Sequence, residues 1–198
     1  MPLLGTLFLA MSTGIVILIV VVALFVVFGL WFVGVYNGLI RVRNRVNEAW
    51  AQIDVQLKRR YDLIPNLVST VKGYAKHEKE LFENVTKARA NAIAAGSVGD
   101  QAKAENMLTG ALRSVFAVAE NYPDLKANEN FLALQEELSS TENKISFARQ
   151  HYNESVRLYN TRQQVFPNSI VARMSGHKPR EMFELEDAAQ REAPNVQF

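Results

Sequence analysis

IVILIVVVALFVVFGLWFVGV, residues 15–35, is the stretch of sequence that decides the fold. All of its residues are apolar or glycine, and at 1.5 Å per residue a helix of this length measures about 31 Å, the thickness of a bilayer's hydrocarbon core. Trp31, Phe32 and Tyr36 gather at its C-terminal end, where aromatic rings favour the membrane interface. The stretch therefore predicts a transmembrane helix over 15–35.

A cleavable signal peptide is the competing interpretation of the same stretch. A signal peptide has a basic segment before a shorter apolar run, and a small-residue cleavage site after it. Residues 1–40 contain no Asp, Glu, Lys, Arg or His and no A-x-A site before the first charges. We therefore predict a retained anchor, preceded by a short exported N-terminus over residues 1–14.

The charged residues all lie on one side of this anchor. The chain has 198 residues with a formal net charge of +2, and all 22 Lys and Arg and all 20 Asp and Glu follow position 40. Arg41, Arg43 and Arg45 come before the first acid, Glu48. The positive-inside rule then predicts a cytoplasmic C-terminal part and an N-terminus outside. The three arginines also favour contact with anionic lipid, unless they serve as a topology signal alone.

Cysteine is absent from the chain. This excludes disulfides, thiolate metal sites, a cysteine nucleophile and lipidation on cysteine. Gly34 and Gly38 form a G-x-x-x-G motif that can let two helices approach closely, although glycine is common in membrane helices without such a role. We therefore favour the interpretation that these two glycines are ordinary residues of a membrane helix and do not pair helices.

Apolar residues recur at steps of three and four after the anchor, from Leu39 to Leu57, so we expect the membrane helix to continue to about residue 60. Asp62 is a good N-cap, and Pro65 is tolerated in a first helical turn. These two residues predict a turn at 60–62 that opens a second helix, ending near residue 95.

Two more helices are predicted further along the chain. The first covers about 101–121, with Asp100 as its cap, and the second, over 126–166, carries a heptad-like stripe typical of a coiled coil. A tail over 167–198 follows, with a short amphipathic helix near 180–189. The predicted fold is all-α: an N-terminal transmembrane helix continuing into an elongated antiparallel four-helix bundle over residues 36–166.

Helix length and topology predict two surfaces on this bundle. The second and fourth helices would be much longer than the third, so an apolar strip would stay uncovered and could bind another helix. The fourth helix would return toward the membrane, so Ile170, Val171 and Met174 at the start of the tail could touch lipid or a neighbouring subunit.

Signatures of catalysis, cofactor binding or nucleic-acid binding are absent from the sequence. His77-Glu78 begins like the zinc motif H-E-x-x-H, but Leu81 stands where the second histidine is needed. A composite metal site of His77 with Glu78, Glu142 or His151 is a remote alternative, because bundle metal sites show paired Glu-x-x-His repeats. We expect no cofactor, metal, small-molecule substrate or nucleic acid, and no enzymatic activity.

Four segments resemble the LemA family of single-pass bacterial membrane proteins. They are YNGLIRVRNRVNEAW (36–50), IDVQLKRRYDLIPNLVSTVKGYAKHE (53–78), ENYPDLKANENFLALQEELSSTENKISFARQHYN (120–153) and VRLYN (156–160). The resemblance implies a helical bundle on a bacterial inner-membrane anchor, and it supplies no catalytic residue. The resemblance also implies three functional contexts. The protein would act beside a membrane zinc metalloprotease of the heat-shock type, in the response to envelope stress, or in shaping membranes, as for a magnetosome relative.

The residues that carry this resemblance are interpreted as fixing the first helical hairpin. They are Trp50, Asp54, Lys58, Arg59, Asp62, Leu63, Pro65, Asn66, Tyr74, His77 and Glu78. The leading hypothesis is a non-enzymatic membrane-anchored scaffold or adaptor that self-associates or docks on a membrane protein partner. The first alternative is an oligomeric membrane-organising protein whose arginines bind anionic lipid, and a metal-dependent enzyme is a remote one.

Overall fold

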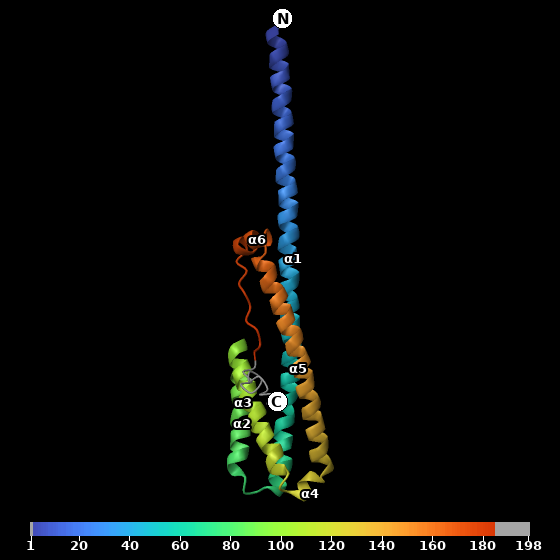
Figure 1. Cartoon of the computed structure of the whole chain (residues 1–198), viewed down its shortest axis with the longest axis vertical. Helices are drawn as coiled ribbons and strands as arrows, with labels where there is room; N and C mark the ends of the chain where they lie inside the picture. Colours follow the sequence, from blue (N-terminus) through green and yellow to red (C-terminus); the bar gives the residue numbers. More distant parts are fainter. Residues whose placement is uncertain (1, 185–198) are drawn as a thin grey trace, which may run out of the picture. The chain divides into compact units, whose positions relative to one another are not determined.

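Six helices make up the computed structural model, which describes residues 2–184, with side chains from residue 14 (Figure 1). They are α1 (Pro2–Tyr74), α2 (Lys79–Ala94), α3 (Val98–Ala119), α4 (Pro123–Lys126), α5 (Glu129–Gln164) and α6 (Asn168–Met174). The described residues contain no strand, which confirms the all-α prediction. The part of α1 that begins at Gly14 is the one described helix long and apolar enough to cross a membrane.

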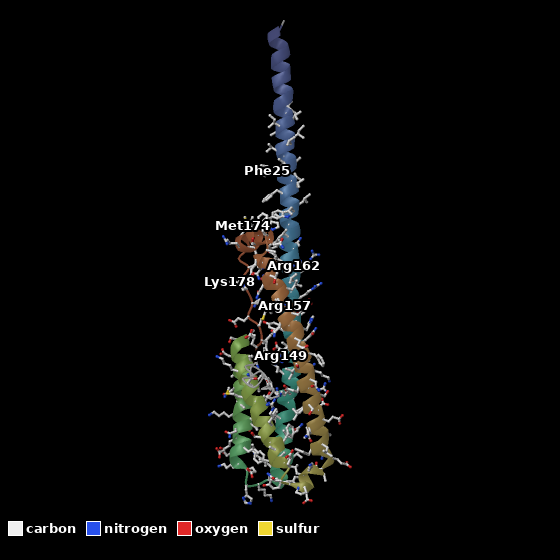
Figure 2. All side chains as sticks on the ribbon, viewed as in Figure 1. Phe25, Arg149, Arg157, Arg162, Met174 and Lys178 are labelled. Carbon is white, nitrogen blue, oxygen red and sulfur yellow. The ribbon has the colours of Figure 1, made fainter. Side chains whose placement is uncertain are left out.

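The described residues form two compact units, and α1 and α5 contribute to both. The anchor unit contains residues 2–44 and 159–179, and the bundle unit contains residues 45–158 and 180–184. In the anchor unit, Trp31, Phe32 and Val35 at the end of the predicted span are half-buried against α6. Phe25 and the other large apolar side chains of residues 15–30 are exposed, and Phe25 stands clear of the other described elements (Figure 2). This is what a lipid-facing helix requires, because apolar side chains in water lose the free energy of burial.

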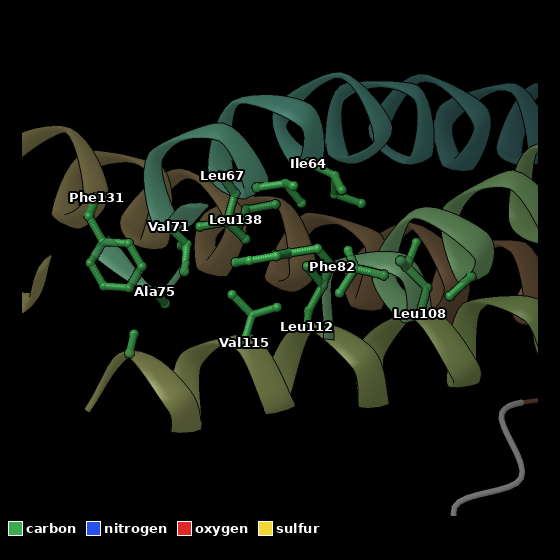
Figure 3. Packing of buried hydrophobic residues seen from close by; sticks show 14 of the residues in the cluster. Ile64, Leu67, Val71, Ala75, Phe82, Leu108, Leu112, Val115, Phe131 and Leu138 are labelled. Carbon is green, nitrogen blue, oxygen red and sulfur yellow. The ribbon is translucent and has the colours of Figure 1, made fainter. Parts of the chain in front are cut away.

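The bundle unit is a four-helix bundle of α1, α2, α3 and α5, and α4 is a single turn between α3 and α5. Its core joins residues of all four helices, labelled in Figure 3: Ile64, Leu67, Val71, Ala75, Phe82, Leu108, Leu112, Val115, Phe131 and Leu138. The buried residues of the core recur mostly at steps of three and four along α1, α2 and α3, and those of α5 lie seven apart, so each helix buries one stripe. The sequence stripes therefore predict the core well.

The predicted turn at 60–62 is wrong, because α1 continues to Tyr74 and the turn lies at 75–78. Asp62 is therefore no N-cap, and Pro65 lies inside the helix. Proline has no N–H to donate to the carbonyl four residues earlier, that of Tyr61. The Nε of Arg89 on α2 donates to this carbonyl instead, at 2.8 Å. A donor from the next helix thus takes over the bond that proline removes.

Other helix ends also differ from the sequence prediction. The third helix begins at Val98, because Ser97 is the N-cap: its Oγ accepts a hydrogen bond from the Asp100 backbone N–H at 3.1 Å. Asn128 caps α5 in the same way, through a 3.0 Å bond from the Phe131 N–H. The short tail helix is α6, whereas residues 180–184 are not helical and 185–189 lie outside the described residues.

The four helices of the bundle unit differ in length, so α2 and α3 pack along only part of α1 and α5. The portions of α1 and α5 in this unit, 45–74 and 129–158, each measure about 45 Å, against about 24 Å for α2 and 33 Å for α3. The long pair is therefore α1 with α5, rather than the predicted second and fourth helices. Over the part of this pair that α2 and α3 do not reach, other residues or solvent must cover the helices.

Candidate docking site

An open groove follows α1 and α5 on one side of the bundle unit. It encloses about 630 Å³. Its lining residues are Ala51, Gln52, Val55, Gln56, Lys144, Phe147, Ala148 and His151. The members on each helix are spaced by one, three or four residues, so they share one face of α1 and one of α5. We call this surface the α1–α5 groove.

Two large apolar side chains of the groove face solvent. Val55 is 63% exposed and Phe147 is 70% exposed. A single exposed apolar residue is ordinary on a protein surface, but apolar side chains from two helices that line one hollow are typical of a docking site. The groove can therefore receive an apolar side chain or helix, and burial of these two residues would favour binding.

The polar groups of the groove define what such a partner must offer. Lys144 and His151 are its ionisable side chains, and no acid lines it. The Oε1 atom of Gln56 is buried and has no hydrogen-bond partner among the described residues. A buried acceptor without a donor costs free energy. The chemistry thus favours an apolar helix with carboxylates beside its apolar stripe.

Outside the groove lining, the same helix pair is covered by residues 180–184 through contacts with Trp50, Tyr152 and Asn153. Phe183 is buried there, with its ring 5.9 Å from that of Trp50, which in turn lies 5.2 Å from Tyr152. Asn153 fixes this segment through bonds with the Phe183 N–H (2.8 Å) and carbonyl (3.1 Å). The α1–α5 pair therefore has one face closed by the chain itself and one face open.

A buried polar cluster joins the helices next to this region. Arg60 Nη1 lies 3.1 Å from Glu105 Oε2 and 2.9 Å from Glu142 Oε2, and Nη2 donates to Thr109 at 2.9 Å. The contact with Glu142 is an ion pair without hydrogen-bond alignment. The Tyr61 hydroxyl donates to the other Glu105 oxygen. Side chains of α1, α3 and α5 therefore meet in one network.

Gln101 completes this cluster and connects it to α2. Its Nε2 contacts the Tyr61 hydroxyl at 2.8 Å, Glu105 at 3.1 Å and the Ala92 carbonyl at 3.2 Å. Burial raises the pKa of Glu105, against the lowering effects of Tyr61, Arg60 and Gln101. Burial also raises the pKa of Tyr61, and the adjacent Glu105 carboxylate adds to this rise. Since these groups bind one another, their arrangement holds helices together rather than presenting a reactive atom.

The residues of the family resemblance are dispersed along α1 rather than gathered at a hairpin. Arg59 forms a surface ion pair with Glu137, and Tyr74 accepts a 3.1 Å bond from Asn128 at the end of α1. Burial raises the pKa of Asp54, and a hydrogen bond from Trp50 opposes this. The other members are exposed or half-buried: Lys58, Asp62, Leu63, Pro65, Asn66, His77 and Glu78. Tyr74, His77 and Glu78 alone lie at the observed turn.

The remote metal alternative gains no support from the geometry. His77 lies in the 75–78 turn, whereas His151 lines the α1–α5 groove. Within residues 2–184, no group of three or more His, Cys, Asp or Glu side chains could hold a metal ion.

Sequence reasoning missed Val55 and Phe147, the exposed residues of the groove. A signal for them existed: each follows a buried stripe residue, Ile53 or Ile145, by two positions, and so cannot share its face. Arg60 had a similar signal, because it lies three residues after Leu57 and four before Ile64 on the buried stripe. A charge on an apolar stripe predicts a buried ion pair.

Comparison with known proteins adds the following similarities. The LemA family model matches residues 49–198. Protein LemA of Metamycoplasma hominis is 28% identical over 146 residues, which cover 71% of this chain and 65% of the relative. Magnetosome protein MamQ 2 of Paramagnetospirillum magneticum is 22% identical over 179 residues, covering 77% and 66%. Magnetosome protein MamQ of Magnetospirillum gryphiswaldense is 22% identical over 174 residues, covering 75% and 64%. The chain spans slightly less than two thirds of these curated relatives.

Proposed function

Because this chain belongs to the LemA family and carries an open apolar groove on its helical bundle, we propose that it is a membrane-anchored helical adaptor without enzymatic activity. Its span holds the bundle at the membrane, and the α1–α5 groove receives an apolar helix of a membrane protein partner. The observation that carries the proposal is the exposure of Val55 and Phe147 on facing helices of one hollow.

The membrane part of this proposal has its own support. The apolar helix and the similarity to the LemA and MamQ proteins support membrane anchoring. We place the anchor in the bacterial inner membrane, with the N-terminus outside and the bundle in the cytoplasm. The arginines at 41, 43 and 45 support this orientation, because they follow the span directly while residues 1–40 carry no charge.

The partner is proposed by its chemistry. A helix that fits the groove presents apolar residues at steps of three and four, with carboxylates that reach Lys144 and His151. A membrane protease or another component of envelope stress responses would fit this role if it exposes such a helix. A second copy of this chain is the alternative occupant, and a homo-oligomer would favour a membrane-organising role.

Photo-crosslinking in native membranes tests this proposal. A benzophenone amino acid at position 147 should form an adduct with one defined protein, and the same group at Met107, an exposed residue of α3, should not. Adding Val55→Lys should abolish the adduct, because a buried charge opposes docking. An adduct with the chain itself would favour the oligomer, and equal yields at positions 107 and 147 would refute the groove.

A further inference from the structure

The anchor unit has a charge composition unlike that of the rest of the chain. Residues 1–44 and 159–179 contain no aspartate or glutamate. Their five basic residues are Arg41, Arg43, Arg162, Arg173 and Lys178. These cations therefore have no carboxylate of their own unit to neutralise them. A unit of this composition attracts anions, most strongly where two cations meet beside an apolar surface.

Two of these cations meet at a hollow on α1. The hollow encloses about 330 Å³ and is lined by Trp31, Gly34, Val35, Gly38, Leu39, Arg41, Arg162 and Asn168. Arg41 closes it from α1, and Arg162 reaches it from α5. A Cβ atom at position 38 would lie 4.0 Å from Nη1 of Arg162, and nothing lies within 4 Å of the corresponding position at Gly34. The two glycines thus provide the space in which the guanidinium groups can hold a ligand.

The hollow lies at the level where the membrane span ends. Helix α6 packs through Val171 and Ala172 on a cluster that contains Trp31, Phe32 and Val35, the last residues of the predicted span. Tryptophan at the end of a span is typical of the headgroup region of a bilayer. The part of the hollow lined by Trp31 and Val35 is therefore apolar and continuous with the predicted span, whereas Arg41 and Arg162 place guanidinium groups in its lining.

Residues 165–174, which connect α5 to α6 and include α6 itself, carry exposed apolar side chains at the same level. Phe166 is 79% exposed and Met174 is 71% exposed, and Ile170 between them also faces outward. Figure 2 shows Met174 on α6, Lys178 after it, and Arg162 on α5. A short helix with apolar and basic side chains on its surface is typical of a segment that lies in the membrane interface.

One histidine holds the chain after α6 against the other two helices. His177 lies with its Nδ1 2.8 Å from the Tyr159 hydroxyl, and its ring lies 6.3 Å from that of Tyr36. Burial and the nearby Arg43 lower the pKa of His177, which favours its neutral form. The hollow thus belongs to a packed element rather than to a loose chain end.

From these observations, we propose that the hollow formed by Gly34, Gly38, Arg41 and Arg162 binds the phosphate of an anionic phospholipid headgroup, with Trp31 against the lipid's glycerol and upper acyl chain. Guanidinium groups bind phosphate through paired hydrogen bonds, which the compact ammonium of lysine cannot match. A lipid is favoured over a free phosphate because one wall of the hollow is continuous with the membrane span. The site rests on the anchoring part of the proposed function and is independent of the α1–α5 groove.

Lipid retention by the full-length chain tests this site. The protein is released from bilayers of equal phosphatidylglycerol and phosphatidylcholine into a mild detergent, and retained lipids are counted by native mass spectrometry. The wild-type chain should retain phosphatidylglycerol preferentially. Arg41→Gln with Arg162→Gln should lower that retention about thirtyfold, from the typical contribution of two basic side chains at a membrane surface.

A steric variant separates a built site from diffuse charge. Gly38→Leu fills the hollow and leaves every charge in place, so it should lower retention to a similar extent. Lys103→Gln with Lys126→Gln removes two exposed charges of the bundle unit and should have no effect. Unchanged retention by Gly38→Leu would overturn the proposal, since any remaining preference would then come from surface charge alone.

Two further results would also overturn the site. One is equal retention of the two lipids by the wild-type chain. The other is displacement of the retained lipid by millimolar inorganic phosphate, which would identify a site for a soluble anion. Crosslinking from position 147 in the same variants reports on the groove separately, so a failure of the lipid site and a failure of the adaptor proposal can be distinguished.

Discussion

Replacing Arg60 with methionine should destabilise the bundle strongly. Arg60 is 4% exposed, and it contacts Glu105, Glu142 and Thr109, three side chains from α3 and α5. Methionine fills a similar volume but removes the positive charge. Glu105, which is 3% exposed, then keeps its hydrogen bonds with Tyr61 and Gln101 and loses its counter-ion. The cost of the substitution is therefore the cost of a stranded buried carboxylate.

Removal of one partner from a buried ion pair costs about 3–5 kcal/mol. Because Tyr61 and Gln101 still donate hydrogen bonds to Glu105, we expect Arg60→Met to cost about 3 kcal/mol, the lower end of this range. For a folded unit of this size, a loss of 1 kcal/mol lowers Tm by about 3–4 °C. Arg60→Met should therefore lower Tm by about 10 °C. Adding Glu105→Gln removes the stranded charge and should recover most of that loss, because a neutral amide can accept the Tyr61 bond.

The assay is thermal unfolding of the full-length protein in mild detergent, followed by far-ultraviolet circular dichroism. Arg59 offers a matched control, since its ion pair with Glu137 lies at the surface with the arginine side chain 48% exposed. Arg59→Met should cost less than about 1 kcal/mol, a shift of at most about 4 °C. Equal shifts for Arg59→Met and Arg60→Met would refute the reasoning that the buried cluster holds the helices together.

The cost of Arg60→Met should also depend on pH. Burial already raises the pKa of Glu105 above its ordinary value, and without the guanidinium this pKa rises further. Between the unfolded and folded pKa values the native state binds the additional proton, so stability falls as pH rises through that window. The destabilisation should thus be largest at about pH 8 and shrink toward about pH 5. A pH-independent cost would contradict a stranded carboxylate as its cause.

Two further predictions follow from other parts of the chain. Arg89→Met should lower the free energy of unfolding by about 1–2 kcal/mol, because it leaves the Tyr61 carbonyl without a donor. Adding Pro65→Ala should recover most of this stability, because alanine supplies a backbone N–H to that carbonyl. Additive losses of stability in a thermal melt would contradict this explanation. For the orientation, Ser12→Cys in this cysteine-free chain should react with a membrane-impermeant maleimide on spheroplasts, whereas Ser97→Cys should react after lysis; the reverse pattern would contradict a cytoplasmic bundle.

The sequence by itself determined the anchor and the helical class. A bilayer imposes its thickness on any span, so the apolar run at 15–35 indicates a membrane helix without knowledge of its neighbours. The buried stripes follow equally directly, because a helix with apolar residues at steps of three and four must bury that face. The family resemblance of residues 36–160 also depends on the sequence alone.

Tertiary structure decided the connections, because they depend on partners far away in the sequence. The helix passes through Pro65 since Arg89 on another helix supplies the missing donor. Arg60 is tolerated on a buried stripe because Glu105 lies beside it in space. Arg162 lies at Gly38 because α5 packs along α1 in the anchor unit. Local sequence patterns indicate the secondary structure that each segment prefers. Whether a buried polar group finds a hydrogen-bond or ion-pair partner depends on which distant segments pack against it, and only the tertiary structure shows that.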